Sequence, residues 1–275
     1  MTYRLVVADI DGTLTTSSGQ ISPRVRRALR RAQRRGVRVC LATGRTWHSG
    51  RRYFETLGAD VPAILYNGGL VFDFKRERVL FRRPMSHRQA RRVIQILDGF
   101  PDLAAHFYVD DEIFVRWRTP LVDANARHDH IAPRAVGDFR PLLVGQPMKF
   151  RILGPRRRLH ALAGRIRRSS ISGTLVFSER ESLEVLPPRT SKGGALRRVG
   201  RHLDIPLREV MAVGNELNDL EMIRAAGLGV AMGNSPPRLR RAADVVAPSN
   251  DEDGLAEVVE RFVLDASPKR RVVHR

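Results

Sequence analysis

The sequence predicts an α/β protein with a Rossmann-like parallel-sheet core and an inserted α/β domain. Short apolar segments alternate with amphipathic helical segments near both ends of the chain, a pattern typical of a parallel sheet covered by helices. Between these ends the pattern changes to paired strands with short turns, which indicates a separate unit. A chain of 275 residues with 42% hydrophobic residues is long enough for two units. We expect a discontinuous core, residues 1–82 and 189–275, around an inserted domain of residues 83–188.

The N-terminal segment predicts three strands separated by two helices. Ser22 and Pro23 supply an N-cap and a first-turn proline for the first helix, and Gly36 can end it. Gly58 can end the second helix in the same way. The expected strands are Tyr3–Ala8, Val37–Ala42 and Ala63–Tyr66, and the expected helices are Pro23 to about Arg35 and Trp47–Leu57.

The middle of the chain predicts a hairpin that leaves the parallel sheet, followed by a mixed α/β unit. The hairpin strands are Leu70–Phe74 and Arg78–Phe81. The elements expected next are a helix from Ser86 to about Asp98, a hairpin of Ala104–Val109 and Ile113–Trp117, strands at Met148–Leu153, Thr174–Ser178 and Leu183–Leu186, and a basic helix Arg156–Arg168. After a stiff proline pair, the parallel pattern resumes with a helix Lys192–Leu203, capped by Ser191, and a strand Val210–Val213.

The chain carries a formal net charge of +20, which raises the question of a nucleic-acid partner. Four of its 49 basic residues are lysines, and the arginines are spread over most of the expected helices. Aromatic residues are not interleaved with them, and no zinc-finger spacing is present. We therefore expect no specific nucleic-acid partner, although a small anionic substrate would be attracted.

Apolar runs in this sequence are far shorter than the roughly 20 residues needed to cross a bilayer. The N-terminal residues lack the basic, apolar and small-residue order of a secretory signal. Cys40 is the only cysteine, so no intramolecular disulfide can form. We expect a cytoplasmic protein with no membrane partner, and the sequence gives no indication of its oligomeric state.

The segment Asp9-Ile10-Asp11-Gly12-Thr13-Leu14 follows the first apolar strand directly. Ligands of open α/β sheets gather at the carboxyl ends of the strands. Two carboxylates there can divide the work, one attacking phosphorus and the other protonating the leaving oxygen and later activating water. An ordinary Asp-Gly turn after a strand is the alternative interpretation.

Three further segments place polar residues at strand ends or helix starts: Leu41-Ala42-Thr43-Gly44-Arg45, Ser191-Lys192-Gly193-Gly194 and Val213-Gly214-Asn215-Glu216-Leu217-Asn218-Asp219. A lysine at a helix N-terminus opposes the helix dipole, so Lys192 needs an anionic partner such as a phosphate or the carboxylates of the segment Asp9–Leu14. The alternatives are a simple strand-to-helix cap at Thr43 and a solvated lysine at position 192.

Together these four segments resemble the motifs of the haloacid dehalogenase-like superfamily. The resemblance extends to its Cof-type branch, which carries a large α/β cap where the inserted unit lies here. The segments that carry this finer resemblance are Tyr66-Asn67-Gly68-Gly69, Val230-Ala231-Met232-Gly233-Asn234-Ser235 and Asn250-Asp251-Glu252-Asp253-Gly254.

The resemblance implies a Mg²⁺-dependent phosphatase that acts on a small phosphorylated metabolite, such as a sugar phosphate, through an aspartyl-phosphate intermediate. It implies Asp9 as the nucleophile, Asp11 as the acid and base, and Lys192 as the catalytic cation. It also implies phosphate contacts from Thr43, Gly44 and Asn218, metal ligation by Asp9, Asp11, Asn215 and Asp219, and supporting roles for Arg45 and Asn67.

Asn215 departs from the family pattern, which has an aspartate at that position. An amide oxygen can still bind a hard cation, but one negative charge is lost, so we expect weaker metal binding. Asp219, or Glu216 if the loop shifts, could restore the charge, and Asn218 and Asp219 could instead act through metal-bound water or orient the loop. Two other functions stay open: a phosphomutase of the same superfamily, and a binding protein that Asn215 has weakened as a catalyst.

The cap is expected to select the substrate, but its sequence assigns no residue to that task. Six polar or aromatic side chains are candidates for contacts with a leaving group: His106, Tyr108, Arg116, Trp117, His128 and His130. The histidines form no convincing metal set.

Overall fold

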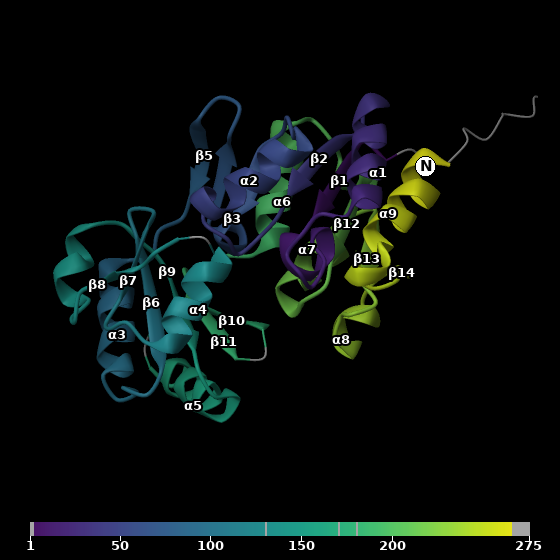
Figure 1. The fold of residues 1–275 in the computed structure, drawn as a ribbon. Coiled ribbons are helices and arrows are strands. Elements are labelled where there is room, and N and C mark those ends of the chain that lie inside the picture. Colours follow the sequence, from purple (N-terminus) through teal and green to yellow (C-terminus); the bar gives the residue numbers. More distant parts are fainter. Residues whose placement is uncertain (1–2, 130, 170, 180, 266–275) are drawn as a thin grey trace, which may run out of the picture.

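The fold has two lobes, and the expected α/β class is confirmed (Figure 1). The structure is a computed structural model that describes residues 3–129, 131–169, 171–179 and 181–265. One lobe contains both ends of the described chain, and the other is built from its middle (Figure 1). Among the described residues, no helix combines the length and the apolar character that crossing a membrane requires.

The core lobe is centred on a five-stranded parallel sheet of order β14-β13-β12-β1-β2. β2 lies on one side of β1, and the later strands β12, β13 and β14 lie on the other side. The order in which strands are added to the sheet therefore reverses between β1 and β12. The strands are β1 (Leu5–Ala8), β2 (Arg38–Leu41), β12 (Val210–Gly214), β13 (Leu228–Ala231) and β14 (Val245–Val246).

Helices cover both faces of this sheet because alternate strand residues point to opposite sides. Val6 of β1 packs in one cluster with Leu29 of α1, whereas Val7 packs in another with Leu196 of α6. Ser22 and Ser191 cap α1 and α6, as the sequence predicts. The helices of this lobe are α1 (Pro23–Arg34), α2 (Trp47–Leu57), α6 (Lys192–His202), α7 (Leu220–Ala225), α8 (Pro237–Arg240) and α9 (Gly254–Val259).

The third expected strand is present and runs parallel to the chain beyond β2, but its longer pairing, with the strand that follows it, is antiparallel and was not predicted. It belongs to a three-stranded antiparallel sheet of β3 (Ala63–Leu65), β4 (Leu70–Asp73) and β5 (Arg78–Arg82), and a single bridge from Ala42 to Ile64 links it to the chain beyond β2. Tyr66 and Asn67 both have positive φ, 50° and 54°, in the turn that sends β4 back along β3. One edge of β3 pairs with β4 and the other meets the chain beyond β2, so the parallel arrangement passes into the antiparallel sheet at this strand.

The cap lobe contains a six-stranded sheet of order β10-β11-β9-β6-β7-β8, antiparallel except for the β7–β8 pair. Its elements are α3 (His87–Leu97), β6 (Ala104–Val109), β7 (Glu112–Val115), α4 (Pro120–Asp129), β8 (Arg134–Ala135), β9 (Pro147–Leu153), α5 (Arg156–Arg167), β10 (Thr174–Glu179) and β11 (Ser182–Leu186). The sequence did not anticipate α4. All six strands lie between residues 104 and 186, and we keep residues 83–188 as our proposal for the cap boundaries.

The two faces of the cap sheet differ in chemistry. Phe150 and Leu183 pack in the cap's own apolar core together with residues of α3 and α5. Their neighbours Lys149, Arg151 and Glu184 point to the other face and line a cavity that core residues also line. The alternation along β9 and β11 therefore places buried charges where the cap meets the core.

We expect Cys40 to be chemically inert in the native protein. Its side chain is fully buried on β2, Sγ lies 3.1 Å from the Pro62 carbonyl oxygen, and burial raises the pKa of the thiol to about 12. Iodoacetamide at pH 8 should leave Cys40 unmodified in the folded chain and alkylate it in guanidinium, as mass spectrometry would detect. Rapid labelling of native protein would contradict this packing.

Candidate active site

Three polar segments meet at one edge of the parallel sheet. Asp9 follows β1, Thr43 comes two residues after β2, and Asn215 follows β12. Because β1 lies between β2 and β12, this edge is the point where the winding of the sheet reverses, and open α/β sheets bind ligands at such a point.

A tight turn after Asp9 brings the first and last of the sequence motifs together. Gly12 has φ +74°, and a Cβ there would lie 2.5 Å from Asn215 Nδ2, so a larger residue would displace Asn215. The Thr13 hydroxyl donates a hydrogen bond of 2.9 Å to Asn215 Oδ1. The Asn215 side chain is thus held directly against the first motif.

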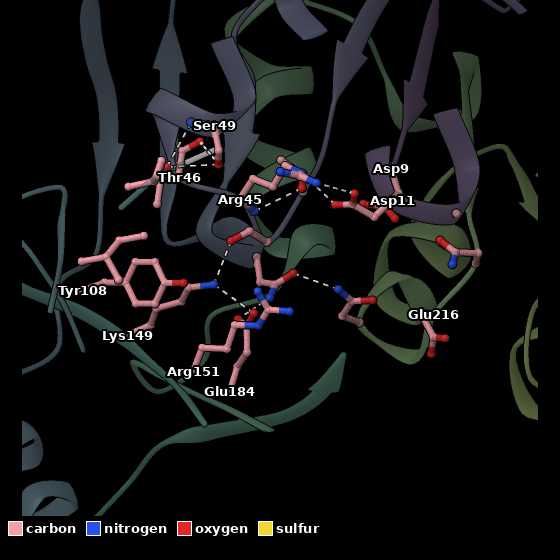
Figure 2. Close-up of a pocket in the computed structure, with 18 residues that line it drawn as sticks. Asp9, Asp11, Arg45, Thr46, Ser49, Tyr108, Lys149, Arg151, Glu184 and Glu216 are labelled. Carbon is pink, nitrogen blue, oxygen red and sulfur yellow. Dashed lines mark hydrogen bonds and ion pairs between the residues drawn. The ribbon is translucent and has the colours of Figure 1, made fainter. Parts of the chain in front are cut away.

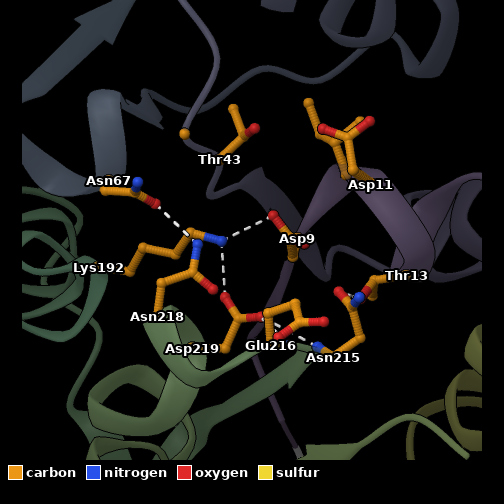
Figure 3. A network of polar contacts seen from close by, with 12 residues as sticks. Asp9, Asp11, Thr13, Thr43, Asn67, Lys192, Asn215, Glu216, Asn218 and Asp219 are labelled. Atoms are coloured by element: carbon orange, nitrogen blue, oxygen red, sulfur yellow. Dashed lines mark hydrogen bonds and ion pairs between the residues drawn. The ribbon is translucent and has the colours of Figure 1, made fainter. Parts of the chain in front are cut away.

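Lys192 lies between two buried carboxylates (Figure 3). Its Nζ donates to Asp9 Oδ1 at 2.7 Å and to Asp219 Oδ1 at 2.6 Å. Lys192 and Asp219 are fully buried, and Asp9 is 6% exposed. Asp9 is one of the anionic partners that the sequence predicts for Lys192, and Asp219 is a second partner that the sequence did not predict. Asp219 Oδ2 also accepts hydrogen bonds of 3.0 Å from the backbone N–H groups of Asn215 and Glu216.

The pKa of Asp9 is raised to about 7. Burial is the main cause, and the charges of Asp219 and Asp11 add to it, while the charge of Lys192 acts in the opposite direction. For Lys192, burial alone would lower the pKa, but the charges of Asp219 and Asp9 outweigh burial and raise it above its ordinary value. The trio therefore keeps a cation beside Asp9, and a further positive charge there would favour the ionised carboxylate that a nucleophile requires.

Arg45 holds the second carboxylate of the first motif. Its Nε and Nη2 donate to the two oxygens of Asp11 at 2.9 and 2.7 Å, a paired geometry that fixes the orientation of the carboxylate. The Arg45 backbone N–H donates to Thr43 Oγ1 at 3.1 Å. Arg45 is almost fully buried, whereas the Asp11 side chain stays 42% exposed toward the cavity.

A cavity of about 270 Å³ opens over these residues and extends to the cap (Figure 2). Figure 2 shows Lys149, Arg151 and Glu184 on the side opposite Asp9 and Asp11. The predicted site residues Asp9, Asp11, Thr43, Gly44, Arg45, Asn67, Asn215 and Asn218 all line the cavity, whereas Lys192 and Asp219 lie buried behind Asp9.

Of the cap residues considered as contacts for a leaving group, some line the cavity and others do not. Tyr108 lines the cavity, whereas His106 is buried on β6 outside its lining, and Arg116 and Trp117 line a separate surface groove. The side chain of His128 and the whole of His130 lie outside the described residues.

Sequence analysis missed Lys149, Arg151 and Glu184 as residues of the cavity. Lys149 and Arg151 alternate with apolar residues in β9, Glu184 lies between apolar residues in β11, and Lys149 is one of four lysines in the chain. A charged residue inside a buried strand is costly without a partner, so this pattern was a signal that could have found them.

The oxygen atoms near Asp9 suit a hard cation such as Mg²⁺, although with less charge than the family pattern provides. No group of three or more His, Cys, Asp or Glu side chains suited to a metal is present in the part of the chain that the structure describes. Asp9, Asp11 and Asn215, which all carry side-chain oxygen atoms, line the same cavity beside the turn at Gly12.

The chain matches the family model of haloacid dehalogenase-like hydrolases over residues 6–259. It is 30% identical to phosphatase YwpJ of Bacillus subtilis over 94% of this chain and all of that protein, and 31% identical to the HMP-PP phosphatase of Serratia proteamaculans over 86% of each. A solved haloacid dehalogenase-like hydrolase from Bacteroides thetaiotaomicron superimposes with a TM-score of 0.84 at 30% identity, covering 94% of this chain and 99% of the other.

The chain therefore belongs to the haloacid dehalogenase-like hydrolases. The matches include the cap as well as the core, and the predicted Cof-type branch is confirmed. The predicted enzyme class, a phosphatase of this superfamily, is confirmed as well.

Replacing Lys192 by Met should destabilise the protein strongly, because Asp9 and Asp219 would remain buried without their cation. Removing one partner of a buried ion pair costs about 3–5 kcal/mol. Urea denaturation in the presence of EDTA would measure the change in the free energy of unfolding. The matched control is Lys75→Met in the exposed β4–β5 turn, which should change stability by less than about 0.5 kcal/mol. Equal stability of the two variants would contradict the central place of Lys192.

Proposed function

We propose that this protein hydrolyses a small phosphorylated metabolite, with Mg²⁺ as cofactor and with Asp9 as a transiently phosphorylated nucleophile. The observation that carries the proposal is the buried Asp9–Lys192–Asp219 trio at the base of a cavity that Asp11 and Arg45 also line. A carboxylate beside a buried cation, with a second carboxylate facing the same space, suits phosphoryl transfer in two steps.

In the first step an Asp9 oxygen attacks phosphorus. The bond from phosphorus to the leaving oxygen breaks, and that oxygen keeps the electron pair and takes a proton from the Asp11 carboxyl group. In the second step Asp11 accepts a proton from water as the water oxygen attacks phosphorus. The bond to Asp9 then breaks, and phosphate leaves. Arg45 keeps the Asp11 carboxylate oriented toward the cavity.

Thr43 and the amides around Gly44 lie at the N-terminal side of α2 and would hold the phosphoryl oxygens. Asp9, the carbonyl of Asp11 and the Oδ1 atom of Asn215 would hold Mg²⁺. Bound Mg²⁺ supplies positive charge that stabilises the transferring phosphoryl group. The contacts of Asp219 with Lys192 and with two backbone amides favour the role of orienting the loop over that of a direct ligand.

The cap limits the size of the substrate. The cavity of about 270 Å³ lies between core and cap residues, and it suits a phosphate with a compact leaving group rather than a phosphorylated protein. The relative from Serratia proteamaculans is named for a small phosphorylated compound, which supports a metabolite as the substrate here. A cytoplasmic location remains part of the proposal.

Asp9→Asn should abolish phosphatase activity, because an amide cannot form the covalent intermediate. Purified protein would be assayed with para-nitrophenyl phosphate and a panel of sugar and cofactor phosphates, with Mg²⁺ and with EDTA. We expect turnover that requires Mg²⁺ and falls at least about 10³-fold in Asp9→Asn. Asp60→Asn, a change in a surface ion pair, is the matched control. Undiminished turnover in Asp9→Asn would refute the mechanism.

Asn215→Asp should strengthen Mg²⁺ binding by restoring a charged oxygen ligand. We expect the Mg²⁺ concentration for half-maximal activity to fall on the order of tenfold. Without Mg²⁺ the same variant should unfold at a lower temperature than the wild type, since another carboxylate joins Asp9 and Asp11. Calorimetry with and without Mg²⁺ would test this second effect. An unchanged Mg²⁺ requirement would place the metal away from Asn215.

A further inference from the structure

Lys149 and Glu184 form a buried ion pair on neighbouring strands of the cap, outside every motif considered above. Lys149 Nζ lies 2.9 Å from Glu184 Oε1, and the two side chains are 2% and 4% exposed. Nζ also lies 4.8 Å from the centre of the Tyr108 ring, which favours a cation at that position. Removing both charges from water is costly, so further polar contacts beyond the cap are needed to offset the loss of hydration.

Both charges reach across to the core. Lys149 Nζ donates to the carbonyl oxygen of Gly44 at 2.8 Å, and Glu184 Oε2 accepts from Asn67 Nδ2 at 2.8 Å. Asn67 Oδ1 in turn accepts from Asn218 Nδ2 at 2.9 Å. A continuous series of polar contacts therefore runs from the cap sheet to the loop that also carries Asn215 and Asp219. Figure 2 shows its cap end at Lys149 and Glu184, and Figure 3 shows its core end at Asn67 and Asn218.

The charge of Glu184 determines the direction of this series. An ionised carboxylate only accepts hydrogen bonds, so Asn67 must turn its Nδ2 toward Glu184. Asn67 Oδ1 is then the atom that faces Asn218, and Asn218 must turn an N–H toward it. Asn218 Oδ1 is left buried, without a hydrogen-bond partner among the described residues. One carboxylate in the cap thus selects the orientation of two amide side chains in the core.

The loop that carries Gly44 packs closely against Asn67 and Glu184. A Cβ at Gly44 would lie 3.1 Å from Asn67 Nδ2 and 3.4 Å from Glu184 Oε1, so the loop after β2 has little freedom to shift against them. Asn67 itself has a positive φ of 54° in the turn before β4. Backbone and side chains therefore hold this junction in one arrangement.

We propose that Glu184 and Lys149 are positioning residues through which the cap orients Asn67 and Asn218 and fixes the Gly44 carbonyl at the active site. The inference rests on the proposed phosphatase function and adds a consequence to it. The rate of phosphoryl transfer depends on the cap even when the substrate is too small to contact the cap.

Steady-state kinetics with two phosphoryl donors of different size, para-nitrophenyl phosphate and acetyl phosphate, tests this consequence. Glu184→Ala should lower kcat by about 10- to 100-fold, the range for residues that orient a metal site, by the same factor with both donors and with little change in KM. Glu184→Gln keeps an acceptor for Asn67 and should lose less. A loss confined to the larger donor, or confined to KM, would make Glu184 a substrate contact and overturn the proposal.

A double-mutant cycle tests whether Glu184 acts through Asn67. If it does, Glu184→Ala combined with Asn67→Ala should be no slower than the slower single variant. Independent effects that multiply would contradict the proposal. Leu183→Ala is the matched control, because Leu183 lies next to Glu184 on β11 but packs in the cap's apolar core. It should lower stability without lowering kcat at temperatures where the protein stays folded.

Hydrogen exchange separates failure of this inference from failure of the proposed function. Amides of residues 64–69 and 215–219 should exchange faster in Glu184→Ala than in the wild type, and Leu183→Ala should leave them unchanged. This result is expected even if the wild type hydrolyses none of the tested substrates, an outcome that would count against the proposed function alone. Unchanged exchange in Glu184→Ala would overturn the positioning role.

Discussion

The ion pairs of Lys192 with Asp9 and Asp219 are the interaction on which the rest of the site depends. They join the end of β1, the start of α6 and the loop after β12, three segments that lie far apart in the sequence. All three charges are buried, so each needs the others to offset its loss of hydration. The buried Asp9 carboxylate thereby gains a cation at 2.7 Å while the loop that carries Asn215 is held in place.

The parallel sheet makes this arrangement possible. Its order places β1 between β2 and β12, so the residues that follow these strands converge at one edge. Tight turns then set their spacing, because Gly12 leaves room for Asn215, and Gly68, at φ +96°, lets the Asn67 turn lie against the backbone of Ser191. The chemistry of the site therefore follows from strand order and from a few positions where only glycine fits.

Much of this was predictable from local patterns. The helix N-caps at Ser22 and Ser191, the hairpin of β6 and β7 and the need of Lys192 for an anionic partner all follow from short stretches of sequence. The antiparallel pairing of β3 with β4 was not predictable in this way, because it depends on a turn whose positive φ values the sequence does not reveal. The contacts of Lys149 and Glu184 with the core were also hidden, since they depend on how two separately folded lobes meet.

Core and cap residues line one cavity, and we propose that the reacting groups lie in the core while the cap supplies part of their orientation. In this proposal Asp9 carries the phosphoryl group between the two steps. The most direct test is to quench the wild-type enzyme in acid during turnover and to locate the phosphoryl group by peptide mass spectrometry. We expect one phosphoryl group on the peptide that contains Asp9, and we expect alkali and hydroxylamine to release it, because an aspartyl phosphate is a mixed anhydride. A phosphoryl group on any other residue would contradict the proposal.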